Sequence, residues 1–600
     1  MTGKTRKKHA TFKLVLGVVS LLIVSIFFVS YYFSNKLKPL LKSELKDLVF
    51  NATDSLYRLE FSDLNVSLIT KGATLLNVKL IPDTTVFKRL IAERRAPNNI
   101  YYIELKKLTI INFQPKQLFK NRKLNVSKVL FENPDVVMVN QQFDFNERSP
   151  SYLQKSPYDY ISKYLAELNI NTIAFTNIRF KYISNAVGKQ EMDSVSNLNI
   201  TLKNWLINKE SDNNSDRLYA LQDIRIALNN YTYATADSLY RINLEQLYFS
   251  SSSGKLNIQS FKVVPRYDEM SFGKLAGYSK ERYAIDLSNI SLEGINFPLY
   301  IRKRELYTTE MTVSNGSVNV FNNNALPSRI KIKNGKFPHQ LLQLLRAPLT
   351  IRLLNLNNIN IAYSEFDRDS GQKGKITFEK TSGTITNITN VARLKKKSPY
   401  LFADLTTYMM GKGKLNASFR FNLDGKEGQF AYSGTLGDMD GRVLNKVTMP
   451  LGMVQIRRGH VQRLTFNIKA NEQKATGKIS FFYKDLSVAL LKRKDKTNKL
   501  VKQGWMSLLA NAMVINSDNP DEKGVMIHAP ISYQRPATAS FFSFIWRTLF
   551  SGIKYSVGVT PQKEQQILNK VQQFEQIKID RDKRKIERSK RRGAKPDRNR

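Results

Sequence analysis

The sequence predicts a mainly β protein: an N-terminal transmembrane helix followed by an elongated, curled antiparallel β-sheet that forms a groove, with a few short helices. Three observations predict this fold. Apolar and polar residues alternate over hundreds of residues, as they do in strands with one apolar face. Helical spacing is confined to short segments, and a single uncharged apolar run near the N-terminus is long enough to cross a bilayer.

That run extends from Leu14 to Phe33, about 20 residues, which is the length that a membrane-spanning helix needs. A dense group of basic residues precedes it, and Tyr31 and Tyr32 lie where an aromatic belt would form. A cleavable signal peptide has a shorter apolar core with small residues at its end, so we interpret the run as a signal anchor. The denser basic cluster on the amino side predicts a cytoplasmic N-terminus and an exported body.

The strand pattern after this run changes phase at regular intervals. Ile285 and Leu287 are followed by Ile290 and Leu292, so the apolar positions shift by one residue, and a similar shift occurs around Asn358. Such a shift turns the following side chains to the other face of the sheet unless a bulge restores them. We therefore expect curved strands, or tight meander turns, that keep one continuous apolar face.

Two internal similarities indicate repetition. The sequence DSLYR occurs at 54–58 and again at 237–241, and a proline follows about 25 residues later in both copies, at Pro82 and Pro265. A second pattern, apolar-x-apolar-x-x-Gly-x-apolar, occurs three times, and a glycine in a strand marks a bulge or a close approach of two backbones. These patterns and the first alternating segment supply the candidate groove-lining residues, which are Leu59, Phe61, Val313, Val318, Ile332, Phe337, Ile456 and Val461.

The segment 536–559 has the period of an amphipathic helix. Its polar stripe includes Arg547 and Lys554, each of which would cost about 2.5–3.5 kcal/mol in mid-bilayer, so a second membrane span is disfavoured. The helix instead caps an end of the groove, lies at a membrane surface, or packs on the protein's own core. Its candidate interfacial residues are Phe542, Ile545, Trp546, Leu549 and Ile553.

The composition argues against most kinds of catalytic site. Cysteine is absent, which removes disulfides, thiol nucleophiles and cysteine-bound metals. The four histidines are far apart, and the sequence has no phosphate-binding loop, dinucleotide-binding fingerprint or nucleophile elbow. We therefore predict no enzymatic activity, no cofactor and no metal site.

The chain is strongly basic, with a formal net charge of +44. Such a charge attracts nucleic acids or anionic lipid head groups and glycolipids. Binding to nucleic acid would need basic residues gathered on one surface, and an exported body rarely meets DNA, so we predict no nucleic-acid partner.

These features divide the chain into five parts. They are a cytoplasmic basic stub with the transmembrane anchor (1–33), a linking helix with the first strands (34–150), a repetitive β-sheet body (151–400), a C-terminal β region with the amphipathic helix (401–560), and a basic, largely disordered tail (561–600).

The order of these parts resembles the AsmA-like family of diderm bacteria. The resemblance lies in the anchor with the segment Leu37 to Asp83, in Ile111 to Asn140 with its Glu-Asn-Pro strand end, and in a C-terminal block formed by Gly413 to Gly425 and Met449 to Lys492. These stretches cover both ends and much of the chain, and their motifs are patterned rather than invariant. The parts 34–150 and 401–560 thus look like the N-terminal and C-terminal regions of that family.

The resemblance implies an inner-membrane protein with a periplasmic body, related to bridge-like lipid-transfer proteins whose curled sheet shields acyl chains. It also implies phospholipid as the ligand, a role in outer-membrane integrity, and another envelope protein as a partner at the C-terminal end. The residues alone leave two alternatives open, which are a sandwich or barrel whose faces pack on each other, and a non-catalytic scaffold for outer-membrane protein biogenesis with a filled core and a protein-binding edge strand.

Overall fold

The computed structural model describes residues 46–560 apart from short gaps, together with scattered residues between 562 and 586. The gaps are 48, 52, 68–69, 115–116, 118–119, 149–156, 164, 187–188, 212–219, 328–333, 495–496 and 503–514. The predicted anchor, the candidate residue Ile332 and much of the predicted tail lie outside the described residues. None of the described helices is long and apolar enough to span a membrane.

The described chain is mainly β, with one large mixed sheet and few helices. The strands are β1 (Tyr57–Glu60), β2 (Asp63–Ser67), β3 (Gly72–Pro82), β4 (Asn99–Phe113), β5 (Lys123–Glu132), β6 (Asp135–Asn140), β7 (Glu167–Ala186), β8 (Lys189–Ile207), β9 (Asp223–Leu228), β10 (Tyr231–Ala234), β11 (Tyr240–Ser250), β12 (Lys255–Pro265), β13 (Arg282–Glu293), β14 (Leu306–Asn323), β15 (Leu349–Phe366), β16 (Lys373–Thr389), β17 (Tyr400–Met409), β18 (Gly413–Asn422), β19 (Phe430–Leu436), β20 (Met439–Asp440), β21 (Val454–Ala470), β22 (Lys474–Lys494), β23 (Thr497–Lys502) and β24 (His528–Gln534). The helices are α3 (Thr84–Ala92), α5 (Phe145–Arg148), α6 (Pro157–Ile161), α7 (Glu269–Ala276), α8 (Phe297–Lys303), α9 (Pro338–Gln343), α10 (Ala392–Lys397), α11 (Asn445–Gly452), α13 (Phe541–Ser556) and the 3-10 helix η1 (Gly441–Leu444).

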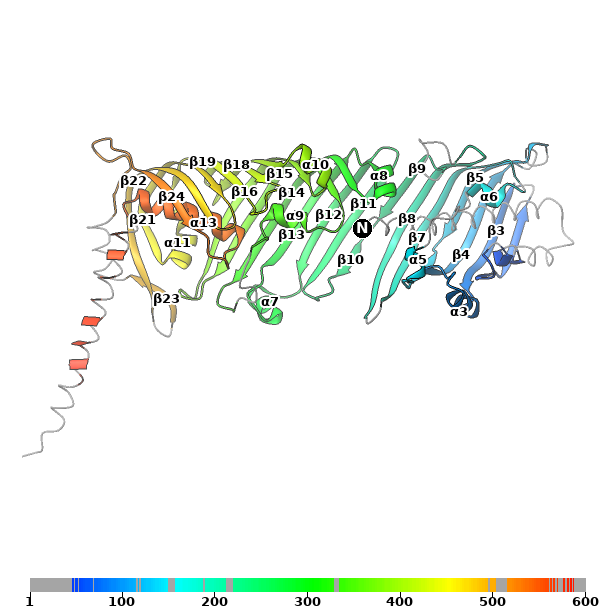
Figure 1. Cartoon of the computed structure of the whole chain (residues 1–600), viewed down its shortest axis with the longest axis horizontal. Coiled ribbons are helices and arrows are strands. Elements are labelled where there is room, and N and C mark those ends of the chain that lie inside the picture. Colours follow the sequence, from blue (N-terminus) through cyan, green and yellow to red (C-terminus); the bar gives the residue numbers. More distant parts are fainter. Residues whose placement is uncertain are drawn as a thin grey trace, which may run out of the picture.

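Neighbouring strands in the sheet are neighbours in the chain (Figure 1). Several short strands form broken pairs: β1 and β2 both pair with β3, β5 and β6 both lie between β4 and β7, and β19 and β20 both pair with β21. The result is a long, twisted sheet with the N-terminal strands at one end and the C-terminal strands at the other.

The expectation of a wholly antiparallel sheet is wrong at two places. The pairs β5–β7, β6–β7 and β14–β15 are parallel. A parallel pair needs a long crossover connection, and the segments 141–166 and 324–348 provide these crossovers. The alternation of apolar residues is the same in parallel and antiparallel pairs of half-exposed strands, so the sequence pattern did not reveal the change of direction.

Left-handed residues inside the strands explain the phase shifts that the sequence shows. Asn289 and Asn358 have φ values of 53° and 56°, in the left-handed region that asparagine adopts more easily than most residues with side chains. The strand β13 keeps its register with both neighbours across Asn289, whereas the pairing of β15 with β16 shifts by one residue at Asn358. The apolar residues Leu287 and Ile290, on either side of Asn289, belong to the same hydrophobic cluster, so the apolar face continues across the phase shift.

The repeated DSLYR sequence corresponds to a repeated structure. Tyr57 of β1 pairs with Pro82 of β3, and Tyr240 of β11 pairs with Pro265 of β12 in the same antiparallel arrangement. In each copy the proline is followed by a short helix, α3 or α7, whose first turn is capped by an aspartate side chain. The two copies share this arrangement, but the first strand of the first copy is broken into β1 and β2.

The tyrosine hydroxyl has the same role in both copies. Tyr57 Oη accepts a hydrogen bond from the Tyr101 backbone N–H at 3.0 Å, and Tyr240 Oη accepts one from the Tyr283 N–H at 3.2 Å. Each hydroxyl thereby fixes the start of the strand after the helix.

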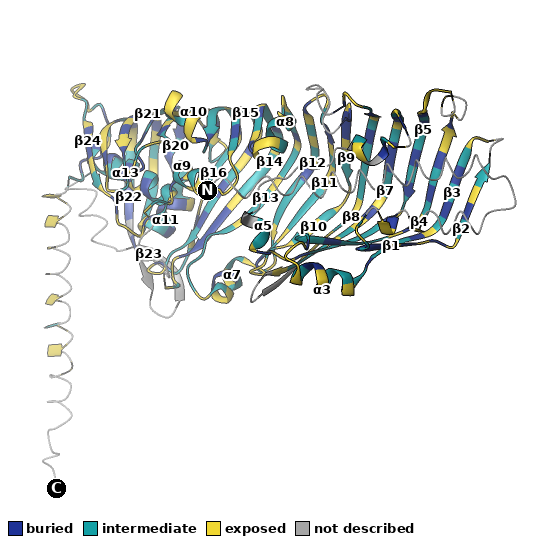
Figure 2. Cartoon of the chain, turned by 45° about the vertical axis from the view of Figure 1, so that its right-hand side comes forward, coloured by how far each residue is buried: buried dark blue, intermediate teal, exposed yellow. Residues whose placement is uncertain are grey.

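The hydrophobic core is divided along the sheet. A large cluster packs beneath the N-terminal strands, and a second cluster packs between the C-terminal strands and the helices α9 and α13 (Figure 1). Between them lies a small cluster with only three buried residues, Ile290, Val313 and Ile359. The two ends of the sheet are therefore covered, and its middle is covered much less (Figure 2).

Candidate functional site

One apolar row crosses the whole described sheet, from β2 to β24. Each member is the direct partner of the next across two strands, so the side chains share one face. In order, the members are Leu64, Leu75, Leu108, Phe131, Phe175, Ile200, Ile226, Phe249, Leu256, Leu292, Met311, Leu354, Ile385, Ala403, Phe419, Tyr432, Ile468, Gly477 and Ile531. We call this set the apolar row.

A second row of partners runs beside it on the same face. Its members are Ile178, Leu198, Leu228, Leu247, Ile258, Ile290, Val313, Leu356, Gly383, Leu405, Ala417, Gly434, Phe466, Ile479 and Ala529. The same small cluster contains members of both rows, which shows that they form one apolar surface in the middle of the sheet.

The apolar row is buried at its ends and only partly buried in its middle. Its first four members and, apart from Gly477, its last members in β19–β24 are buried, whereas most members between β7 and β16 are partly exposed. Phe249 is the exception in this part because the ring of Phe297 from α8 packs against it, with the centroids 5.2 Å apart. Phe175, Ile200 and Ile226 still pack against the N-terminal core, and Ile385 packs against the C-terminal core. We call the part from Leu256 to Leu354 the open stretch.

The opposite face of the sheet is polar. Direct partners on neighbouring strands form ion pairs there, such as Lys79 with Glu104 at 3.0 Å and Lys262 with Asp286 at 3.3 Å. These exposed pairs contribute little stability, but they show which face meets water. The sheet is thus apolar on one face and charged on the other.

The structure separates the candidate groove-lining residues into different places. Val313 lies in the second row, and Val318 packs beside the same cluster, so these two adjoin the open stretch. Leu59 and Phe61 belong to the packed N-terminal core, and Phe337 and Val461 belong to the C-terminal core.

Two further candidates complete the set. Ile456 is half-buried in β21, where it pairs with Val488. Ile332 lies outside the described residues. The central members of the apolar row, such as Met311 and Leu354, are not among these candidates, because strand register is needed to bring them together.

Helix α13 covers the apolar face at the C-terminal end of the sheet (Figure 1). Its buried side consists of Phe544, Thr548, Gly552 and Ser556. A Cβ atom on Gly552 would lie 2.5 Å from Ile531 Cδ1, so the glycine lets the helix approach the sheet closely.

Three of the five candidate interfacial residues pack beside this buried side. Ile545, Leu549 and Ile553 pack partly against the C-terminal core, and Trp546 stacks on Phe550 with the ring centroids 5.7 Å apart. Phe542 is 45% exposed, and its ring stacks on Tyr363 of β15 at 5.9 Å. The helix therefore caps one end of the apolar face by packing on the protein's own core.

The edge of the open stretch near α13 carries a polar group. Tyr363 Oη donates a hydrogen bond to Glu365 Oε2 at 2.9 Å, and Asn324 also donates to this carboxylate. Burial raises the pKa of Glu365 above its usual range. The apolar face thus ends here at a partly buried carboxyl.

The crossover 324–348 is fastened to the C-terminal core by Arg535. The guanidinium donates hydrogen bonds to Asn334 Oδ1 at 2.9 Å, to the Glu472 carbonyl at 3.0 Å and to the Ala539 carbonyl at 2.6 Å. It also lies over the ring of Phe337, 4.8 Å from the centroid. The crossover is thereby held across the sheet against α13.

His339 is buried in the same aromatic cluster, with its ring 5.0 Å from that of Phe421. Burial lowers its pKa to about 4, against smaller opposing effects of the Gly428 backbone and Glu472. The neutral ring is therefore the form that fits the folded protein.

We expect a loss of stability as the pH falls from about 6.5 to 4. Above pH 6.5 the His339 ring is neutral in the folded and in the unfolded protein. Below this pH the unfolded chain takes up a proton that the folded chain does not, and this lowers the free energy of unfolding by up to about 3 kcal/mol at pH 4. Urea unfolding at several pH values measures this. His339→Phe should flatten this part of the profile, and an unchanged profile in His339→Phe would contradict the assignment.

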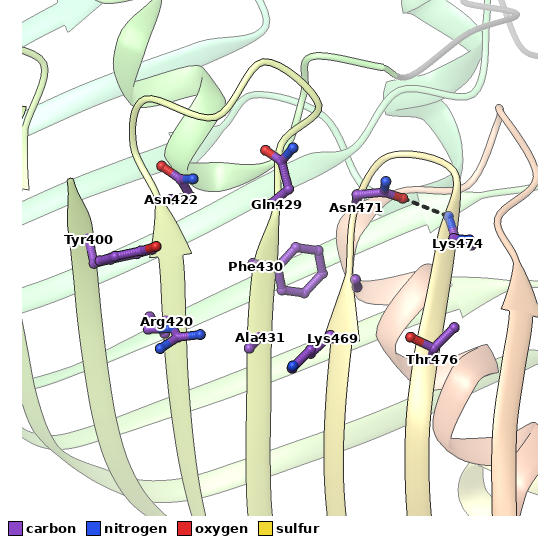
Figure 3. Close-up of a pocket in the computed structure, with 11 residues that line it drawn as sticks. Tyr400, Arg420, Asn422, Gln429, Phe430, Ala431, Lys469, Asn471, Lys474 and Thr476 are labelled. Carbon is purple, nitrogen blue, oxygen red and sulfur yellow. Dashed lines mark hydrogen bonds between the residues drawn. The ribbon is translucent and has the colours of Figure 1, made fainter.

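A shallow basic pocket of about 300 Å³ lies on the opposite, polar face near the C-terminal end of the sheet (Figure 3). Arg420, Ala431, Lys469 and Thr476 are successive partners across its floor, and the guanidinium of Arg420 lies 5.1 Å from the ring centroid of Tyr400. The pocket combines basic, polar and aromatic residues, and none of its lining residues belongs to the apolar rows.

Among the described residues, no group of three histidine, cysteine, aspartate or glutamate side chains is placed to hold a metal ion. The feature that distinguishes this molecule is therefore its continuous apolar face. No model of a known protein family matches the chain, and no curated protein matches its sequence.

Proposed function

We propose that the protein binds and transfers lipid, and that the open stretch of the apolar row shields acyl chains from water. The observation that supports this proposal is a row of apolar side chains that is continuous across the sheet but only partly buried in its middle. In this proposal the body is periplasmic, is anchored in the inner membrane with the N-terminus in the cytoplasm, and supports the integrity of the outer membrane.

The energetic argument concerns methylene groups. Each methylene that an acyl chain removes from water stabilises the complex by about 0.8 kcal/mol. A chain lying along successive strands would meet an apolar side chain at every strand of the open stretch, because the row has no polar member between Leu256 and Leu354. Such binding is non-directional, so a lipid can slide along the row without a specific site.

The alternative function, a scaffold for outer-membrane protein biogenesis, expects a filled core along the whole sheet. The packed ends agree with it, and the partly exposed middle argues against it. The lipid proposal also includes an envelope protein as a partner at the C-terminal end, and it includes neither nucleic-acid binding nor catalysis.

We expect Met311→Asp to lower the amount of phospholipid that copurifies with the full-length protein by about tenfold, since a carboxylate against acyl chains costs well over 1.4 kcal/mol. Thr312→Asp is the matched control, because Thr312 is the next residue of β14 and its side chain lies on the polar face. The measurement is mass spectrometry of lipids extracted after transfer into nanodiscs of a distinguishable synthetic lipid.

Two results would refute lipid binding by this face. One is a folded wild-type protein that retains no cellular lipid. The other is equal retention by Met311→Asp, Thr312→Asp and the wild type.

A further inference from the structure

Three segments that are far apart in the chain meet at one long edge of the sheet. They are the end of α8 with residues 302–306, the loop 344–348, and α10 with residues 393–397. Asn390 Nδ2 donates hydrogen bonds to the carbonyls of Leu345 and Ala347 at 3.2 and 3.0 Å, and the Leu306 N–H donates to the Pro348 carbonyl at 2.8 Å. Arg393 forms an ion pair with Glu305, which joins α10 to the end of α8.

We call these three segments the rim. Figures 1 and 2 show α8 and α10 at the same edge of the sheet, and exposed residues in both.

Exposed leucines are concentrated on the rim. Leu306 is 41% exposed, Leu344 63% and Leu345 50%. Single exposed leucines are common on protein surfaces, but three within one small region are a sign of a binding surface. None of the three belongs to the apolar row, so the rim is a separate feature of the fold.

The same segments are strongly basic. They contain eight basic residues and one acidic residue: Arg302, Lys303, Arg304, Arg346, Arg393, Lys395, Lys396 and Lys397 against Glu305. Glu305 is buried and is engaged by Arg393, and Lys395 lies 3.7 Å from Asp424. Most of the positive charge is exposed beside the leucines.

We propose that the rim docks on the surface of an anionic lipid bilayer, with the leucines inserted among the lipids and the basic residues at the head groups. Segments that bind in the membrane interface combine exposed aliphatic side chains with flanking lysine and arginine residues. The core of a protein–protein interface, in contrast, is depleted in lysine and enriched in aromatic residues. The composition of the rim therefore favours a membrane over an acidic protein.

The rim lies close to the open stretch of the apolar row. Leu306 and Leu349 begin β14 and β15, and five residues further along these strands lie Met311 and Leu354 of the open stretch. At about 3.3 Å per residue, the docked bilayer would lie roughly 16 Å from the open stretch. Resting on the proposed function, we infer that lipid enters or leaves the sheet sideways, at this edge.

The absence of cysteine allows a site-specific test with the full-length chain. Leu345→Cys, labelled with an environment-sensitive dye, is held in phosphatidylcholine nanodiscs and mixed with vesicles that contain phosphatidylglycerol. We expect a blue shift with these vesicles, little shift with phosphatidylcholine vesicles, and weakening by salt. In the same labelled chain, the combined substitutions Arg346→Glu, Lys396→Glu and Lys397→Glu should weaken the apparent affinity at least tenfold. The control is a labelled Ser433→Cys on the polar face, which should not shift even if the basic tail brings vesicles close.

Three outcomes would overturn the proposal: no shift at position 345, an equal shift at position 433, or the same shift with soluble polyglutamate, which would indicate an acidic macromolecule as the partner. The lipid content of the wild type separates this proposal from the proposed function. If the wild type retains lipid but the labelled protein shows no shift, only the docking of the rim is refuted. If the wild type is lipid-free but the labelled protein shows the shift, only the lipid-binding face is refuted.

Discussion

Phe337→Ala is expected to destabilise the C-terminal part of the protein by about 3–5 kcal/mol, the usual cost of removing a fully buried phenylalanine. Phe337 is 1% exposed, and its ring contacts those of Phe430, Phe541 and Phe544 at centroid distances of 5.3, 5.6 and 6.2 Å. The substitution therefore leaves a cavity between the crossover, the sheet and α13. Urea unfolding measures the loss, and hydrogen exchange should localise it to α13 and β19.

Phe542→Ala is the control for this result. Phe542 lies in the same helix but is 45% exposed, so its removal should cost no more than about 1 kcal/mol. The comparison also separates two interpretations of Phe337. If this residue lined a lipid-binding surface, as the sequence pattern predicted, Phe337→Ala would reduce lipid retention and leave stability nearly unchanged.

Arg535→Met is expected to cost about 3–5 kcal/mol. The substitution leaves the buried carbonyls of Glu472 and Ala539 without their donors, at about 1–3 kcal/mol each, and removes the cation that lies over Phe337. Arg535→Lys should recover little of this loss, because an ammonium group cannot reproduce the fork of the guanidinium. Urea unfolding of the three proteins measures the difference.

Arg420→Met provides the matched comparison. Arg420 also lies over an aromatic ring, that of Tyr400, but it is exposed on the polar face, so we expect a change within about 1 kcal/mol. If Arg535→Met and Arg420→Met were equally stable, Arg535 would not be what holds the crossover to the C-terminal core.

The alternation of apolar residues was sufficient to predict a mainly β fold with one continuous apolar face. The phase shifts at Asn289 and Asn358 correspond to left-handed residues that keep one continuous apolar face, and a change in the conformation of one residue is visible in the local sequence pattern. The repeat was found for the same reason: the spacing of Tyr57 and Pro82 is set by one hairpin.

Features that depend on distant parts of the chain could not be predicted in this way. The parallel pairs follow from the paths of the two crossovers, which the strand pattern does not record. Phe337 was placed with Val313 because both fit the same short pattern, yet one is enclosed by α13 and the other adjoins the open stretch. The rim, similarly, exists only because α8, α10 and the loop before β15 end at the same edge.

The correspondence between strand order and chain order bears on how the molecule is synthesised. Most strands dock on one made shortly before them, so a chain emerging from a ribosome or a translocation channel can fold progressively from its first strands. The contacts are close in sequence, which keeps the entropic cost of closing each loop low. The same arrangement makes length adjustable, because inserting another unit such as β11–β12–α7–β13 would extend the apolar row without altering the contacts of strands further away.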